Sequence, residues 1–242
     1  MQIKTRAIVF RTVKYGETSL IVDLFTEEKG LHTFILSGVR SPKSRFSPGL
    51  LQPMSVIEVV TYFGENHSMH RIKEVAASLI FQHIPFELRK GSVALFLAEI
   101  CRKTVRETEP DPILFDFLVK TLDFLDKTDR PVANIHLHFL LELASLLGFL
   151  PGGEASESTP FFDLQEGVFC ELRPPHPFFL DKNESSAVHQ LLGKTLENCH
   201  ETAIDRPLRK SLLGHLLQFY KLHLDQFGEV HTPEVLEMVL AE

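Results

Sequence analysis

Cysteine is scarce in this 242-residue chain, which has three cysteines far apart in the sequence. Cys101, Cys170 and Cys199 have no paired spacing, which argues against a disulfide framework and against a zinc ribbon. We therefore expect reduced, buried thiols. Long apolar runs are also missing, since no segment approaches the ~20 apolar residues that a membrane-spanning helix needs. A soluble globular protein that does not engage a membrane is expected.

Targeting and phosphate-cradling motifs are missing as well. The first residues, MQIKTR, lack the apolar core of a secretory signal, so the expected location is the cytoplasm. Without a glycine motif of the P-loop or dinucleotide-binding type, no use of ATP is expected. Groupings that could ligate a metal or activate a nucleophile lack a third member, so we expect structural or solvated roles for His138 with Glu142, His67 with His70, and Cys199 with His200. No cofactor, metal or catalytic residue is predicted.

Positive charge is in overall deficit, with a formal net charge of -7. This balance argues against a nucleic-acid-binding surface over the whole molecule, because affinity for nucleic acid comes mainly from cations that replace counterions on phosphates. Residues 1–78, however, contain ten Lys and Arg against seven Asp and Glu, whereas the remainder contains fifteen against twenty-five. A mildly basic amino-terminal part thus precedes an acidic body, which would confine any nucleic acid to one end.

Five runs rich in Ile, Val, Phe, Thr and Tyr fill the first 76 residues, separated by glycine-containing turns. These runs predict strands over residues 3–13, 20–25, 31–36, 56–63 and 68–75. Five short strands suit an OB-like barrel, and an SH3-like barrel would satisfy the same pattern.

Helical periodicity begins after Pro85 and continues to the carboxyl terminus. The expected helices are 93–105, 113–125, 132–147, 184–196, 206–227 and 233–240. Gly148 is expected to take a left-handed conformation at the end of a central, buried helix. Residues 151–183 predict an irregular module with a hairpin over 161–172. The predicted architecture is an α+β multidomain chain, with a five-stranded barrel over 1–78 and an all-helical domain over 79–242.

A basic loop between two strand-like runs is the most informative feature of the amino-terminal part. It places three cations and an aromatic side chain among turn-forming residues, namely Arg40, Lys43, Arg45 and Phe46. Such a loop suits phosphate binding, and a solvated surface turn is the alternative.

Other cations and aromatic residues of the predicted barrel complete a candidate nucleic-acid-binding set. The further cations are Arg6, Arg11, Lys14, Arg71 and Lys73. Tyr15, Phe46 and Tyr62 are the candidate stacking partners, since single-strand binders combine a cationic groove with aromatic platforms. Tyr62 and Phe63 alternate sides of a strand, so only one of them can face solvent freely. Phe25 and Phe34 are expected to pack in the core.

A second cationic group lies at the start of the long predicted helix. Arg206, Arg209 and Lys210 fall on neighbouring helical positions and could extend a DNA path. A solvated helix face is the alternative, although cations at a helix start oppose the helix dipole.

The order of these segments resembles that of a known family. The resemblance rests on KTRAIVFR at 4–11, YGE at 15–17, LIVDLFT at 20–26, the basic loop, and LQP at 51–53. In this order they resemble the amino-terminal domain of the RecO family, bacterial recombination mediators of DNA repair, and the likeness extends more loosely over the whole chain. The resemblance implies an OB-fold followed by a helical domain.

The same resemblance implies a non-enzymatic function. A RecO-like chain would bind single- and double-stranded DNA, anneal complementary strands, and act with RecR to let RecA replace single-strand binding protein. The acidic, apolar tail of single-strand binding protein should need an apolar groove edged by cations. For that edge the sequence offers Arg89, Lys90, Arg102, Lys103 and Arg106.

Many RecO-like chains hold a structural zinc with two Cys-x-x-Cys pairs after the central helix. Here the corresponding stretch retains only Cys170, with Arg173 three residues later. Since zinc needs about four ligands, we expect a zinc-free module stabilised instead by Phe161, Phe162, Phe169, Phe178 and Phe179.

Two other classes of protein fit the composition. One is a structural adaptor, in which a β-barrel and a helical bundle contact proteins alone, as the acidic body would allow. The other is an RNA-binding protein with an OB-fold. Competition between RNA and DNA would distinguish it from a DNA-binding protein, because only RNA carries a 2′-hydroxyl.

Overall fold

The computed structural model describes residues 2–39, 47–64, 68–106 and 108–240. Contacts divide the chain into two compact units, one of residues 1–86 with 97–126 and the other of residues 87–96 with 127–242. Helix α1, Leu88–Thr104, contributes residues to both units. The expected division between residues 78 and 79 stays a prediction.

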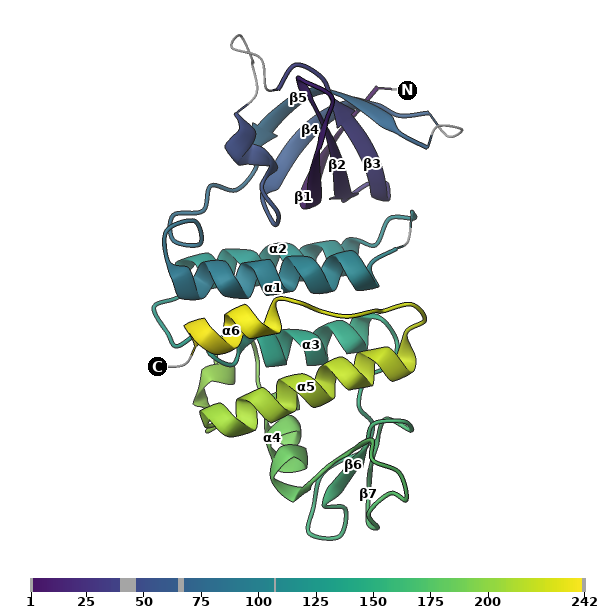
Figure 1. The fold of residues 1–242 in the computed structure, drawn as a ribbon, viewed down its shortest axis with the longest axis vertical. Helices are drawn as coiled ribbons and strands as arrows, with labels where there is room; N and C mark the ends of the chain where they lie inside the picture. The colour runs from purple at the N-terminus through teal and green to yellow at the C-terminus, as the bar shows by residue number, and fades with distance from the viewer. Residues whose placement is uncertain (1, 40–46, 65–67, 107, 241–242) are drawn as a thin grey trace. The chain divides into compact units, whose positions relative to one another are not determined.

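The first unit contains a closed barrel of five strands (Figure 1). The strands β1 to β5 are Gln2–Tyr15, Ser19–Thr26, Gly30–Leu36, Val56–Tyr62 and His70–Ala77. Their order around the barrel is β1-β2-β3-β5-β4, and β3 and β5 form the one parallel pair among the described strands of the barrel. This arrangement confirms the predicted OB-fold and decides against the SH3-like alternative. The 3₁₀ turn η1, Pro48–Leu51, follows β3.

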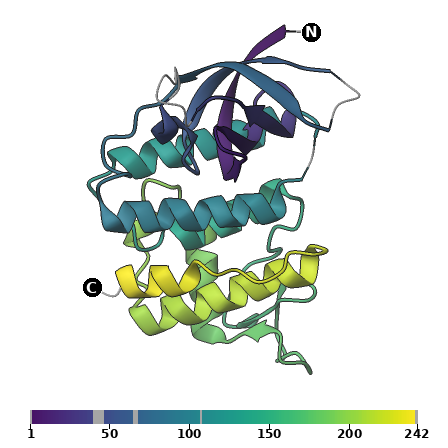
Figure 2. The ribbon, with the colours of Figure 1, turned by 45° about the horizontal axis from the view of Figure 1, so that its top comes forward.

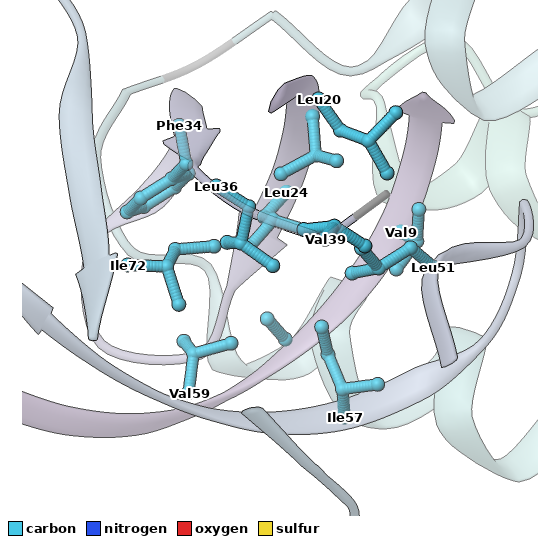
Figure 3. Close-up of a cluster of buried hydrophobic side chains, with 12 residues drawn as sticks. Val9, Leu20, Leu24, Phe34, Leu36, Val39, Leu51, Ile57, Val59 and Ile72 are labelled. Carbon is cyan, nitrogen blue, oxygen red and sulfur yellow. The ribbon is translucent and has the colours of Figure 1, made fainter. Parts of the chain in front are cut away.

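The interior of the barrel is filled by alternate side chains of every strand (Figure 3). On β2, Leu20, Val22 and Leu24 point inward and are buried, whereas Ile21 and Asp23 do not belong to the core. Each buried side chain of this size stabilises the fold by about 1.5–3 kcal/mol. A shift of register between Val9 and Arg11 lets the long strand β1 bend and pair with both β2 and β4.

Helix α2, Pro112–Lys127, packs on part of the outer barrel wall within the same unit (Figures 1 and 2). The ring of Phe115 lies 5.9 Å from that of Phe25, which stacks on Phe10 at 5.6 Å. Phe25 and Phe34 are fully buried, as predicted. The buried carboxylate of Asp126 accepts three backbone hydrogen bonds of 2.8 Å from residues 82–84, which follow the barrel.

The second unit is mainly helical. It contains α3 Ile135–Leu146, α4 Lys182–Leu192, the 3₁₀ turn η2 Cys199–Glu201, α5 Arg206–His223 and α6 Pro233–Val239. Helix α3 is largely buried, as its apolar density predicted, and the hydroxyl of Tyr220 on α5 donates to the carbonyl of Leu140 at 2.6 Å. Helix α5 is shorter than expected because Leu224 takes an extended conformation. Helix α4 ends at Leu192 rather than at residue 196.

The predicted hairpin lies in a small three-stranded sheet. Strands β6 Phe161–Asp163 and β7 Val168–Cys170 form it, and β8 Phe179–Leu180 adds a strand that the sequence did not predict. Phenylalanine rings pack here: Phe162 lies 4.9 Å from Phe169 and 5.8 Å from Phe219 of α5. Gly148, after α3, has a φ of 88°, the left-handed conformation that was predicted.

Within the part of the chain that the structure describes, no helix combines the length and apolar character that a membrane span requires.

Candidate nucleic-acid interface

The outer wall of the barrel carries one row of side chains that runs across all five strands. Cross-strand registers pair Val13 with Ile21, Ile21 with Ile35, Ile35 with Arg71, and Arg71 with Tyr62. Residues paired in this way project from the same face of a sheet. We call these five residues the belt. With strands spaced about 4.8 Å apart, the belt extends for about 19 Å around the wall.

Large apolar and aromatic side chains on and beside the belt are exposed to solvent. Tyr62 is 53% exposed and Val13 41%, and Tyr15, two residues beyond Val13, is 55% exposed. Met69, two residues before Arg71, is 39% exposed. An exposed tyrosine ring can stack on a base, a contact worth about 1–3 kcal/mol per base. The belt therefore combines stacking surfaces with the guanidinium of Arg71.

A polar row runs beside the belt on β1, β2 and β3. Arg11 is paired in register with Asp23, and Asp23 with Thr33. The Nε of Arg11 donates to Oδ2 of Asp23 at 2.7 Å, and the hydroxyl of Thr33 donates to Oδ1 at 2.8 Å. Each member lies two residues along its strand from a belt residue. We call this the polar row.

The described barrel cations that were predicted to bind DNA differ in their surroundings. Arg71 lies in the belt and Arg11 in the polar row, while Lys14 is exposed at the end of β1. Lys73 is also exposed, and its Nζ lies 3.3 Å from the carboxylate of Glu74. Their DNA contacts stay predictions.

The basic loop, over residues 40–46, lies outside the described residues. Four of the predicted binding residues lie outside the described residues, namely Arg40, Lys43, Arg45 and Phe46. Their role stays a prediction from the sequence.

Arg6 contributes to the packing of the first unit. It forms two hydrogen bonds to the carboxylate of Glu27, at 2.8 and 2.5 Å, and lies 3.7 Å from the carboxylate of Asp116 on α2. Its guanidinium is also 5.2 Å from the ring centre of Phe115. The hydrogen bonds from Arg6 lower the pKa of Glu27 below its ordinary value. Arg6 therefore joins the barrel to α2, and its contact with DNA stays a prediction.

Strand alternation predicted correctly that only one of two neighbouring aromatic residues would face solvent freely. Tyr62 is exposed, whereas Phe63 is half-buried and stacks on His70 at 4.1 Å. The sequence reasoning missed the apolar members of the interface, Val13, Ile21 and Ile35. For Ile21 and Ile35 the signal was the same alternation, since each lies between two buried core residues on its strand.

In the second unit, the predicted cations of α5 surround a pocket of about 320 Å³. Arg206 is exposed at its edge, and Lys210 donates to Glu237 of α6 at 2.8 Å. The other predicted cation, Arg209, is half-buried and donates to the carbonyl of Ile204 at 2.8 Å, so part of its donor capacity is used within the fold. The apolar lining is Pro207, Leu213, Leu236 and Leu240.

A buried histidine also lines this pocket. His136 of α3 is 1% exposed, and burial, reinforced by the nearby charge of Arg209, lowers its pKa to about 3. Its Nδ1 has no hydrogen-bond partner among the residues that the structure describes. The pocket thus combines apolar walls, cations at its edge and a neutral imidazole.

The cations predicted to contact a protein partner do not all face solvent. Arg89, Arg102 and Arg106 are exposed, and Lys103 is half-buried with its Nζ 4.0 Å from Glu99. Lys90 is only 5% exposed and lies 3.6 Å from the carboxylate of Glu87. Because its stem and ammonium are buried, Lys90 does not belong to an exposed cationic edge, which corrects that part of the expectation.

No group of three or more metal-ligating side chains comes together in the described part of the chain. The thiols of Cys101 and Cys199 are buried, as expected, and burial raises the pKa of Cys199 to about 11. Cys170 is half-buried, and its Sγ donates to the carbonyl of Leu172 at 3.3 Å. Two of the three thiols are thus packed in the interior, and the third is hydrogen-bonded to the backbone.

The closed barrel with its parallel β3–β5 pair and its outer belt, followed by a helical unit, defines a multidomain protein of the OB-fold class. Family models agree over most of the chain. The model described as Recombination protein O N terminal matches residues 1–81, and the model described as Recombination protein O C terminal matches residues 85–230. The chain belongs to the RecO family.

Curated relatives extend over the whole chain. The DNA repair protein RecO of Phocaeicola vulgatus is 35% identical over 234 residues, which cover 97% of both chains. That of Flavobacterium psychrophilum is 34% identical over 243 residues and 100% of both chains. That of Bacteroides fragilis is 32% identical over 97% of both. The family to which this chain belongs is thus one of DNA repair proteins.

Proposed function

We propose that this chain binds DNA through the belt and acts in DNA repair and homologous recombination. The exposed belt is the observation that carries the proposal. OB-folds bind oligonucleotides on the wall formed by strands 2 and 3 and with the loops that join strands 1 to 2 and 4 to 5. The belt crosses β2 and β3. Tyr15 and Tyr62 are the last residues of β1 and β4, so each stands at the start of one of these two loops.

Strand annealing is the activity that such a surface supports best. Cations that neutralise the phosphates of two strands reduce the repulsion between them, and stacking holds unpaired bases open for collision. No bond is made or broken in this process, so a protein without a catalytic group can perform it. We propose binding of single- and double-stranded DNA on this basis.

Membership of the RecO family supports a more specific role. We propose that the chain acts with RecR to help RecA replace single-strand binding protein on DNA. This role requires a second surface for proteins, separate from the DNA-binding belt.

The α5–α6 pocket is our candidate for the contact with the acidic, apolar tail of single-strand binding protein. Its edge carries Arg206 and Lys210, and its walls are apolar. The cations of α1 support the contact less well, because Lys90 is buried. Binding of a labelled tail peptide should weaken on Arg206→Glu and persist on Arg102→Glu, which reverses the same charge on α1. The opposite pattern would return the contact to α1.

A strand-annealing assay tests the central function. Two complementary labelled strands should anneal faster with the protein at low salt, and a triple alanine variant at Arg40, Lys43 and Arg45 should lose part of the effect if the basic loop contributes. No binding or annealing, even with RecR added, would favour the adaptor class. Preference for an RNA competitor over DNA of equal length and sequence would favour the RNA-binding class.

A further inference from the structure

The polar row places an acidic side chain beside the proposed DNA path. Asp23 lies two residues from Ile21 on β2, and its carboxylate is bound on one side by Arg11 and on the other by Thr33. The side chain of Asp23 is 18% exposed and that of Arg11 is 47% exposed. Arg11 therefore reaches solvent next to the belt while its charge is paired.

A phosphate near Arg11 would meet both the positive charge of the guanidinium and the negative charge of Asp23. Only Nε of Arg11 is used by Asp23, and its terminal nitrogens have no hydrogen-bond partner among the described residues. A phosphate that approached those nitrogens would also lie close to the carboxylate. The attraction of the guanidinium and the repulsion of the carboxylate would then largely cancel.

We propose that Asp23 acts as an electrostatic brake on DNA binding by this barrel. It neutralises Arg11 and keeps an anion beside the belt, so that bound strands are released readily. This inference rests on the proposed function, since it assumes that the belt binds a strand. Release matters for an annealing protein, because a strand that is held too tightly cannot leave as a duplex.

The Thr33 bond makes a clean test possible. In Asp23→Asn, the side-chain oxygen can still accept from Thr33, while the negative charge is gone. If Arg11 then neutralises one more phosphate, the affinity for a single strand should rise on the order of tenfold at about 50 mM salt. The slope of log affinity against log salt concentration should become steeper by about 0.7. Asp23→Thr, a neutral residue that favours strands, should give the same direction and serves if Asp23→Asn folds poorly.

Two comparisons isolate the mechanism. In an Arg11→Gln background, Asp23→Asn should produce a smaller gain, because only the repulsion of the carboxylate is then removed and no cation is released. Glu28→Gln removes the same charge from the β2–β3 turn and should change affinity far less. Fluorescence anisotropy with a labelled single strand measures all variants, and thermal unfolding confirms that each is folded.

The outcomes separate this inference from the proposed function. Suppose that the wild type binds DNA and that Tyr62→Ala weakens this binding, so that the belt is the binding surface. Unchanged or weaker binding by Asp23→Asn would then overturn the brake and indicate that Asp23 holds Arg11 in a binding position. An equal gain in the Arg11→Gln background would also overturn it. Absence of DNA binding by the wild type and every variant would overturn the proposed function and the brake together.

Discussion

Tyr62 on β4 and Arg71 on β5 are direct cross-strand neighbours, and both side chains face solvent. The phenol ring can stack on a base, and the neighbouring guanidinium can bind a phosphate of the same strand. Tyr62→Ala should therefore weaken single-strand binding by about 1–3 kcal/mol. Tyr62→Phe retains the ring and should bind nearly as the wild type. Equal dissociation constants for the alanine variant and the wild type, measured by anisotropy, would remove Tyr62 from the interface.

Gly30 is expected to be essential for the first unit. Its φ is 71°, and an added Cβ would lie 2.3 Å from the carbonyl oxygen of Glu109. Gly16 has a similar φ of 60° but open space around it, so Gly16→Ala isolates the backbone strain. Gly30→Ala should destabilise the protein by about 1–3 kcal/mol more than Gly16→Ala, because the Glu109 backbone must move. Urea unfolding measures the difference, and equal losses would show that the loop yields freely.

Asp126 is expected to fix the segment that follows the barrel. Its buried carboxylate accepts hydrogen bonds from the backbone of Gln82, His83 and Ile84. Asp126→Asn replaces one acceptor oxygen by a donor, which leaves a buried N–H without its bond. We expect a loss of about 1–3 kcal/mol in the free energy of unfolding. Asp129→Asn, at an exposed position, should cost far less. Similar urea midpoints for the two variants would contradict this role.

The stability of the second unit should depend on pH through His215. Its hydrogen bond with Glu184, at 2.8 Å, raises the pKa of His215 above its ordinary value of 6.5. Burial acts to raise the pKa of Glu184, but hydrogen bonds from His215 and Ser211 leave it lowered. A histidine with a raised pKa stabilises the folded state fully below pH 6.5 and loses this effect as the pH rises through its folded value.

The melting temperature should therefore fall over this interval in the wild type. His215→Gln should flatten that part of the profile, because the glutamine side chain does not titrate. A variant profile parallel to that of the wild type would assign the pH dependence to other groups.

Local patterns were sufficient to predict the barrel. Strand-like runs, glycine turns and alternation predicted five strands, and alternation predicted that only one of Tyr62 and Phe63 would face solvent freely. The OB arrangement itself depends on the parallel contact of Phe34 and Ile35 with residues of β5, which no local pattern contains. The resemblance to a family supplied that choice.

The pairing of the cations could not be read from the sequence. Arg6 and Glu27 are 21 positions apart, and Arg11 and Asp23 are 12 apart, so only the strand register brings each pair together. The register shift after Val9 also sets which acid Arg11 meets. The buried position of Lys90 depends on packing within its unit, which a count of charges does not reveal.

The salt dependence of single-strand binding tests the central claim most directly. Anisotropy titrations over a range of salt should give a linear fall of log affinity with log salt for the wild type. Arg71→Ala should reduce the slope by about 0.7, as expected for the loss of one phosphate contact on a single strand. Lys120→Ala, which removes an exposed cation of α2, should leave the slope unchanged. Binding that does not respond to salt, or equal slopes for the wild type and Arg71→Ala, would contradict DNA binding at the belt.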